Sequence, residues 1–337
     1  MNQPILISTA QALVASGKGL LAADESLGTI GKRFEALGIE STPESRRDYR
    51  EMLFTTPGAA DVLSGIILFD ETIRATDSTG KPFPQMLDDK GIIAGIKVDG
   101  GAHNMALFGG EKVTDGLDGL RERLIEYRQL GARFAKWRAV ITIGDGIPTH
   151  ACLAANAEAL ARYAALCQEQ DIVPIIEPEV VMDGEHSIER CQHITERALR
   201  ATFSQLNMQR VLLEGLLLKP NMVLPSLSSD EKPDADEVAR LTLQTLRRSV
   251  PAAVPGIVFL SGGQTSQDAT ARLNAMNSTD QCLPWQVSFS FARALQNDAM
   301  EIWGGKAENA EAAQAAFAKR LKSNSAARRG EYSAQME

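Results

Sequence analysis

Residues 212–222, "LLEGLLLKPNM", join a run of leucines to a single lysine, which is followed by Pro220 and Asn221. A short apolar run that ends in loop-forming residues is typical of a buried strand. Lysine is almost never fully buried without a partner, so Lys219 has an unusual place at the carboxyl end of such a strand. Taken alone, the pattern also fits a lysine whose amine reaches solvent from the end of its strand.

Seven further apolar runs of the same kind lie before and after this one. Their centres are spaced by roughly 30 to 45 residues, which leaves room for a helix and two loops in each interval. The eight predicted strands are residues 19–24, 65–69, 92–99, 134–141, 172–180, 211–219, 256–263 and 285–291.

Helical patterns fill the intervals between these strands. In residues 116–131, the side chains of Leu117, Leu120, Leu124 and Tyr127 share one face of a helix. Similar apolar stripes with charged opposite faces occur in residues 154–170, 187–206 and 234–250.

Eight strands alternating with helices predict an α/β fold, a (β/α)₈ or TIM barrel, rather than an open doubly wound sheet. A dinucleotide-binding fold would require G-x-G-x-x-G after the first strand, and "ADESLGTIG" at 23–31 does not supply it. We expect one domain over residues 1–337, with a helical extension and a polar tail from about residue 304.

The composition narrows the class of protein. The 337 residues carry a net charge of −8 with a pI near 5.3, which argues against nucleic acid as the main partner and against a basic membrane-binding patch. The amino-terminal stretch lacks the pattern of a signal peptide, and no apolar run reaches the roughly 18 residues of a membrane helix. We expect a cytoplasmic protein with reduced cysteines, no cofactor and no metal site, because its Cys and His residues are scattered.

Ionisable residues gather at the carboxyl ends of the predicted strands. In a barrel these ends surround the active site, and residues two apart on a strand share a face. A single pair of this kind could be a salt-bridged plug, but five strands contribute to the set, and such assemblies shift pKa values for catalysis. The set consists of Asp24, Lys97, Asp99, Lys136, Arg138, Glu177, Glu179 and Lys219.

Two neighbouring stretches have the character of a phosphate site. "LSGGQ", at 260–264, offers Ser261 and the amides of Gly262 and Gly263, which can approach a phosphate closely. Arg293 follows the eighth predicted strand and could bind the same phosphate. Phosphate sites after strands seven and eight recur in this fold.

The chemistry of Lys219 follows from its surroundings. A lysine that attacks a carbonyl must be neutral, and apolar neighbours and nearby cations both disfavour the ammonium form. Forming and breaking an imine also requires proton transfers, which carboxylates can supply. We interpret Lys219 as a Schiff-base nucleophile.

The chain resembles the class I fructose-1,6-bisphosphate aldolases over nearly its whole length, about residues 10–330. The resemblance implies a (β/α)₈ barrel that cleaves fructose 1,6-bisphosphate reversibly to dihydroxyacetone phosphate and glyceraldehyde 3-phosphate, without metal, in glycolysis and gluconeogenesis. The segments that carry it are "GKGLLAADES", "GIKVD", "FAKWR", "PIIEPEV", "LLLKPNMV", "FLSGGQ", "ARALQ" and "WGGKAEN".

The resemblance also implies a role for each matching residue. Lys219 looks like the Schiff-base lysine, Glu177 like the acid/base of imine formation, and Asp24 like the acceptor of the C4 hydroxyl proton. Lys136 would support charge beside the imine, and Glu179 would position the lysines. The implied phosphate and substrate contacts are Ser261, Gly262, Gly263 and Arg293 for the C1 phosphate, Ser26, Thr29 and Lys97 for the C6 phosphate, and Arg138 and Arg33 as further substrate or phosphate contacts.

Two departures from the family pattern bear on these expectations. Tyr332 is not terminal, whereas animal members carry a terminal tyrosine that assists late proton exchange, so the preference between one-phosphate and two-phosphate sugars stays open. Ala292 stands where a glycine is familiar, although its backbone N–H remains.

Two other functions would also fit a barrel with a lysine at a strand end. Another Schiff-base enzyme, such as a transaldolase-like protein, would need one phosphate site, whereas Lys97 and Arg293 predict two. A non-catalytic sugar-phosphate-binding barrel predicts loss of Lys219, Glu177 or Asp24, and all three are present. A homotetramer is expected by resemblance only, and the physiological direction of the reaction stays open.

Overall fold

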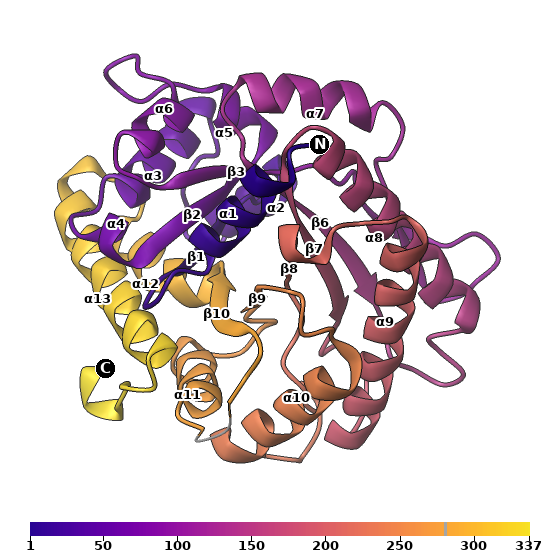
Figure 1. Ribbon diagram of the computed structural model, residues 1–337. Coiled ribbons are helices and arrows are strands. Elements are labelled where there is room, and N and C mark those ends of the chain that lie inside the picture. The colour runs from indigo at the N-terminus through magenta and orange to yellow at the C-terminus, as the bar shows by residue number, and fades with distance from the viewer. Residues whose placement is uncertain (280–281) are drawn as a thin grey trace.

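Eight parallel strands close into a barrel in the computed structural model, which describes residues 1–279 and 282–337. Around the barrel the strands follow the order β1-β10-β9-β8-β7-β6-β3-β2, so that neighbours in sequence are neighbours in space (Figure 1). All eight predicted strands are present, and the predicted (β/α)₈ barrel is confirmed. The strands are β1 (Gly19–Ala23), β2 (Leu63–Leu68), β3 (Ile93–Lys97), β6 (Phe134–Ile141), β7 (Val173–Val180), β8 (Leu217–Leu218), β9 (Gly256–Phe259) and β10 (Gln286–Phe291).

The strand that contains the leucine run is shorter than predicted. Of residues 211–219 only β8 pairs as a strand, and Leu213–Gly215 form a 3-10 helix before it. The turn brings Gly215 against Leu6, whose Cβ lies 2.9 Å from the position that a Cβ on Gly215 would occupy. Beyond β8, the amide of Lys219 still donates to the carbonyl of Ile176 at 2.8 Å, so the lysine remains attached to β7.

The helices form a ring outside the barrel, as expected for this fold (Figure 1). The predicted apolar stripe of residues 116–131 forms α7, in which Leu120, Leu124 and Tyr127 are buried and Leu117 lies just before the helix. No helix in residues 1–279 and 282–337 combines the length and apolarity needed to cross a membrane. The ring consists of α3 (Pro43–Phe54), α4 (Ala59–Val62), α5 (Asp70–Arg74), α6 (Phe83–Asp88), α7 (Leu120–Gln129), α8 (His150–Glu169), α9 (Ile188–Met208), α10 (Ala235–Ser249), α11 (Ser266–Asn277) and α12 (Arg293–Trp303).

The predicted carboxy-terminal helical extension is α13 (Ala310–Arg328), which lies beside α12 and α11 at the edge of the ring (Figure 1). It begins after Gly304, whose left-handed backbone, with φ 53°, ends α12. Arg320 of α13 is almost fully buried and forms an ion pair with Glu337. The last residues therefore fold back onto α13 rather than extending away from the barrel.

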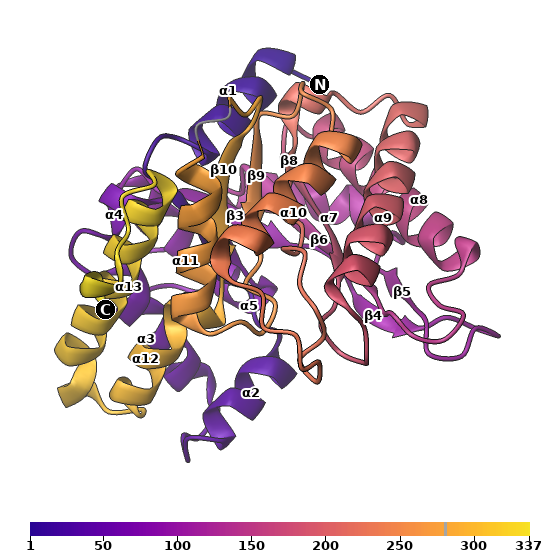
Figure 2. The same cartoon turned by 90° about the horizontal axis from the view of Figure 1, so that it is seen from below.

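Helix α1 (Gln3–Leu13) lies across one end of the barrel, at the opposite end from α2 (Leu27–Glu35) and the hairpin of β4 (Gly101–Asn104) and β5 (Lys112–Asp115) (Figure 2). None of these four elements appears among the sequence predictions. Side chains at the end of α1 fill space left open by glycines: a Cβ on Gly65 would lie 2.8 Å from Leu13, and one on Gly256 would lie 2.5 Å from Val14, the residue that caps the helix. The helix thus closes the amino-terminal end of the barrel.

Candidate active site

The carboxyl ends of the barrel strands surround a cavity of about 410 Å³. A larger groove of about 650 Å³ lies between α10 and α11 on the outer ring, away from the lysine–carboxylate cluster. The barrel cavity contains most of the ionisable residues that the sequence placed at strand ends. It is lined by Ala22, Asp24, Glu25, Thr29, Lys32, Arg33, Lys136, Arg138, Glu177, Glu179, Lys219, Leu260, Ser261, Gly262, Ser290, Ala292 and Arg293.

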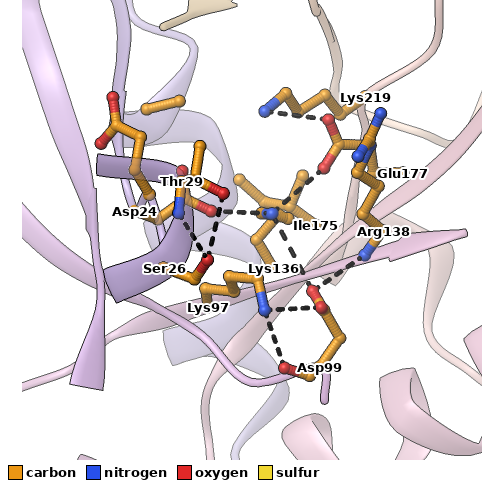
Figure 3. Close-up of polar contacts among 12 residues, drawn as sticks. Asp24, Ser26, Thr29, Lys97, Asp99, Lys136, Arg138, Ile175, Glu177 and Lys219 are labelled. Carbon is orange, nitrogen blue, oxygen red and sulfur yellow. Dashed lines mark hydrogen bonds and ion pairs between the residues drawn. The ribbon is translucent and has the colours of Figure 1, made fainter. Parts of the chain in front are cut away.

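Two lysines and two carboxylates form the centre of this cavity (Figure 3). Lys219 Nζ lies 3.1 Å from Glu177 Oε1, and Lys136 Nζ lies 3.4 Å from the other oxygen of the same carboxylate. Lys136 Nζ also lies 2.7 Å from Asp24 Oδ2. All four residues are buried, with at most 9% of any one exposed, so the contacts are poorly screened by solvent.

Asp99 extends this network on the side of Lys97 (Figure 3). Its Oδ1 lies 2.6 Å from Lys97 Nζ, and its Oδ2 lies 3.9 Å from Lys136 Nζ and accepts a hydrogen bond from the Arg138 amide at 3.3 Å. Lys97 and Lys136 are register partners on β3 and β6, which explains why one carboxylate reaches both. The sequence placed Asp99 in the charged set at the strand ends but assigned it no catalytic or binding role.

The charges in the centre fix each other's protonation states. Burial alone would raise the pKa of Asp24, but the nearby ammonium groups, Lys136 first, outweigh it and hold that pKa below its usual value. Burial alone would lower the pKa of Lys136, but Asp24, Glu177 and Asp99 raise it well above its usual value. At neutral pH, Asp24 is therefore an anion and Lys136 a cation.

Arg138 and Glu179 form a second ion pair beside the centre. The Arg138 guanidinium donates to Glu179, and Arg138 is the register partner of Glu177 across β6 and β7. Burial alone would lower the pKa of Arg138, but the Glu179 carboxylate has the larger effect and raises the pKa of the guanidinium above its usual value. Glu179 therefore pairs with Arg138, and in the described part of the chain no hydrogen bond or ion pair joins it to the lysines that it was predicted to position.

The predicted C1-phosphate residues meet at one wall of the cavity. Gly262 and Gly263, with φ of 58° and 91°, both adopt the left-handed backbone that favours glycine. A Cβ on Gly263 would lie 3.8 Å from Arg293 Nη2, so this loop and the first residue of α12 are neighbours. Ser261, Gly262 and Arg293 line the cavity directly.

The residues expected at the C6 phosphate are less uniformly placed. Ser26 caps the amino terminus of α2, and its hydroxyl lies 3.1 Å from the Thr29 hydroxyl. Arg33 is held by Glu25, and Lys97 is held by Asp99. Of the predicted phosphate residues, Ser26, Lys97 and Gly263 do not line the cavity, whereas Thr29 and Arg33 do.

Several residues of the cavity were missed by the sequence reasoning. Glu25 and Lys32 belong to the first loop and to α2, and their one available signal was their position directly after the first strand. Ser290 lies on the inward face of β10, and its buried hydroxyl has no hydrogen-bond partner among the described residues. Within the same part of the chain, no three His, Cys, Asp or Glu side chains are grouped to hold a metal ion.

The fold and the cavity together define a class of protein: a (β/α)₈ barrel with a buried lysine–carboxylate centre beside a glycine loop and an arginine. The sequence model of the class-I fructose-bisphosphate aldolase family matches residues 5–337. A "Probable fructose-bisphosphate aldolase class 1" of Xylella fastidiosa is 56% identical over 97% of this chain and 98% of its own length. A cytosolic fructose-bisphosphate aldolase of Arabidopsis thaliana is 50% identical over 97% of this chain and 83% of its own length.

A solved structure gives the same result. It is a fructose-bisphosphate aldolase from Plasmodium falciparum in complex with TRAP and a small-molecule inhibitor, with a TM-score of 0.96 and 46% sequence identity. The alignment covers 98% of this chain and 95% of that one. The chain belongs to the class-I fructose-bisphosphate aldolase family, whose members are lyases.

Proposed function

We propose that this protein cleaves D-fructose 1,6-bisphosphate reversibly to dihydroxyacetone phosphate and D-glyceraldehyde 3-phosphate through a Schiff base on Lys219. One observation carries the proposal: Lys219 Nζ lies 3.1 Å from a carboxylate oxygen of Glu177, and both groups are buried in the cavity at the carboxyl ends of the strands. An amine and a carboxylate at hydrogen-bond distance form the nucleophile and acid/base pair that imine chemistry requires.

The first half of the reaction forms the imine. The Lys219 amine attacks the C2 ketone, and Glu177 returns a proton to the carbinolamine oxygen, which leaves as water. The neighbouring Lys136 cation, 3.4 Å from Glu177, stabilises negative charge on the carbinolamine oxygen as it develops. The iminium that results can accept an electron pair, so no other electron sink is required.

The second half breaks the carbon–carbon bond. Asp24 is an anion at neutral pH, as the lowered pKa of its carboxyl group indicates, and it accepts the proton of the C4 hydroxyl. The C3–C4 electron pair moves to the iminium, the aldehyde product leaves, and the remaining enamine is protonated at C3. Hydrolysis of the second imine releases dihydroxyacetone phosphate and regenerates the Lys219 amine.

Two groups of anion-binding residues support a substrate with two phosphates. Ser261, Gly262 and Gly263 would bind the C1 phosphate with Arg293. Ser26, Thr29, Lys97, Arg33 and Arg138 would bind the C6 phosphate and the sugar hydroxyls. Because Lys97 is paired with Asp99 and Arg33 with Glu25, binding at the C6 side requires these cations to exchange a protein carboxylate for the phosphate.

The cellular setting follows from the relatives. The cytosolic names of the plant relatives support a cytoplasmic location, and the name of the matching family model, Glycolytic, supports a role in glycolysis. A role in gluconeogenesis is proposed because the cleavage is reversible. We also propose that residues 1–337 fold as one domain and assemble as a homotetramer. Sugar phosphates are the proposed partners, with neither nucleic acid nor membrane among them.

Borohydride trapping tests the proposal. Reduction of the imine formed with dihydroxyacetone phosphate should add the substrate irreversibly to the peptide that contains Lys219, as peptide mass mapping would report. Lys219→Arg is the control, because a guanidinium keeps the charge but remains protonated. Label on another lysine, or no label, refutes the assignment, and activity lost in EDTA and restored by zinc refutes the metal-independent mechanism.

A further inference from the structure

A further cavity, of about 300 Å³, lies outside the barrel between α3 and α5, beside the first residue of α6. Pro43 and Phe83 give it an apolar wall, and four arginines surround it: Arg46, Arg47, Arg50 and Arg74. Two acids, Glu44 and Glu71, also line it among the described residues. The volume is at the lower end of the range for small-molecule sites. We propose that this cavity, hereafter the α3 pocket, binds a small phosphate monoester.

Arg50 is the residue that points to an anion. Only 3% of it is exposed, and its Nη2 donates to Glu25 at 2.6 Å. Its Nη1 is buried and has no hydrogen-bond partner among the described residues. A buried charged donor without a partner is costly, and an oxyanion bound in the pocket would supply the missing acceptor.

Glu25 does not neutralise Arg50 alone. The same carboxylate also binds Arg33, so one negative charge is shared between two guanidinium groups, and the triad retains one net positive charge. The side chains of Arg50 and Glu25 are only 4% and 7% exposed, so solvent screens this excess poorly. A phosphate monoester is a strong acceptor that matches the planar fork of a guanidinium.

The other three arginines of the α3 pocket are paired with carboxylates. Arg46 binds Glu71 through two nitrogens, at 2.8 and 2.6 Å, and Arg74 binds Asp70 and Glu126. Arg47 is partly exposed and pairs with its neighbour Asp48. Carboxylates thus neutralise these three guanidinium groups, and Arg50 provides the unmet hydrogen bond.

The triad Arg50–Glu25–Arg33 connects the α3 pocket to the catalytic cavity, because Glu25 and Arg33 line that cavity. An anion that engages Arg50 leaves Glu25 to interact more strongly with Arg33. Arg33 would then be less available to a substrate phosphate, so occupancy of the α3 pocket should raise KM. This last step rests on the proposed function, whereas binding in the pocket does not.

Calorimetric titration with phenyl phosphate tests the site directly. The protein is first blocked in the catalytic cavity by borohydride reduction with dihydroxyacetone phosphate; if the adduct does not form, the proposed function fails, and the same titration is run on the unblocked protein. We expect one binding event that weakens about tenfold or more in Arg50→Gln, because a charge-assisted bond is lost. Arg47→Gln is the matched control on the same helix and should change the affinity less than about threefold.

A second variant tests the site even if Arg50→Gln does not fold. Ala75→Phe fills the α3 pocket and leaves every charge in place, so it should abolish binding in a folded protein. Equal affinity in wild type, Arg50→Gln and Ala75→Phe would overturn the site. In kinetic assays, phenyl phosphate should raise KM more in wild type than in Ala75→Phe, and an equal effect in both would overturn the coupling through Glu25.

Discussion

The two halves of the barrel interior differ in polarity: apolar side chains fill the amino-terminal half, and charged side chains fill the carboxyl half. At the amino-terminal end, α1 and the first residues of the strands enclose a purely apolar cluster that contains Leu6, Leu13, Phe134, Ile175 and Leu217. At the carboxyl end, the same strands continue into the network around Lys136 (Figure 3). The change takes place within single strands: Phe134 and Lys136 are two residues apart on β6, and Ile175 and Glu177 are two residues apart on β7.

The difference shows how the fold supports a charged site. Buried ions contribute little net stability, because their desolvation offsets their attraction, whereas buried aliphatic side chains contribute directly. We therefore expect the apolar half, together with α1, to supply most of the stability of the barrel interior. The charged half would supply the catalytic groups.

Removing the central cation should have the largest effect. Lys136→Met leaves Asp24 and Glu177 without their shared partner, so we expect a loss of about 3–5 kcal/mol in the free energy of unfolding. Turnover should fall by about a hundredfold to a thousandfold or more, because charge stabilisation at the imine is also lost. Urea unfolding and steady-state assays on fructose 1,6-bisphosphate measure the two effects.

The matched control lies one strand away. Ile175 is the register partner of Lys136 and belongs to the apolar half, so Ile175→Met introduces the same side chain at the paired position of the adjacent strand. Volume-conserving changes of this kind cost less than about 1.5 kcal/mol. If the two variants lost equal stability, the division between the halves would be wrong.

The two central carboxylates should fail at different steps. Glu177→Gln should bind the bisphosphate but form the imine slowly, whereas Asp24→Asn should form the imine and then stall before bond cleavage. Each change should lower turnover by about a hundredfold to ten-thousandfold, the range of acid–base catalysis. Borohydride quenching at successive times counts the imine, and an aldehyde assay counts cleavage. Cleavage by Asp24→Asn at the wild-type rate would remove Asp24 from its proposed role.

A substitution in the apolar half should lower stability and leave catalysis unchanged. Leu13 is fully buried at the end of α1, against Gly65, so Leu13→Ala opens a void that nearby backbone cannot fill. We expect a loss of about 2–5 kcal/mol in the free energy of unfolding. At a temperature where the variant is folded, its kcat and KM should match the wild type. A fall in kcat larger than about threefold would mean that α1 also shapes the charged half.

The same contrast explains what could be predicted from the sequence. The strands of the barrel were visible because their apolar runs are local and regularly spaced, and the charged residues were visible because they stand at the ends of those runs. Helix α1 was missed because its sequence, "QPILISTAQAL", mixes small and polar residues, and its burial depends on the distant Gly65 and Gly256. The β4–β5 hairpin was missed because its strands are four residues long and largely polar.

The ion-pair partners in the site could not be predicted from the sequence, for a different reason. Sequence spacing predicts which residues face the lumen, but not which partner each long side chain selects. Lys97 and Arg33 were both expected to be free for phosphate, yet they pair with Asp99 and Glu25. Such choices depend on rotamers and on the register between strands, which only the assembled barrel defines.

The smallest effect should be a dependence of stability on pH that only the charged half shows. Because the pKa of Asp24 is lowered on folding, its contribution is present above the unfolded-state pKa, about 3.8, and is lost as the pH falls through the lower folded-state value. Lys136 behaves in the opposite sense: its pKa is raised, so its contribution is present below the usual value and is lost only as the pH rises through the raised folded-state value. Asp24→Asn should therefore lose less stability than the wild type when the pH is lowered below about 3.8.

In Leu13→Ala the loss in the free energy of unfolding relative to wild type should stay constant with pH, because no titrating group was removed. Urea unfolding at a series of pH values compares the three proteins, and an acid limb of equal slope in wild type and Asp24→Asn would show that other carboxylates govern it.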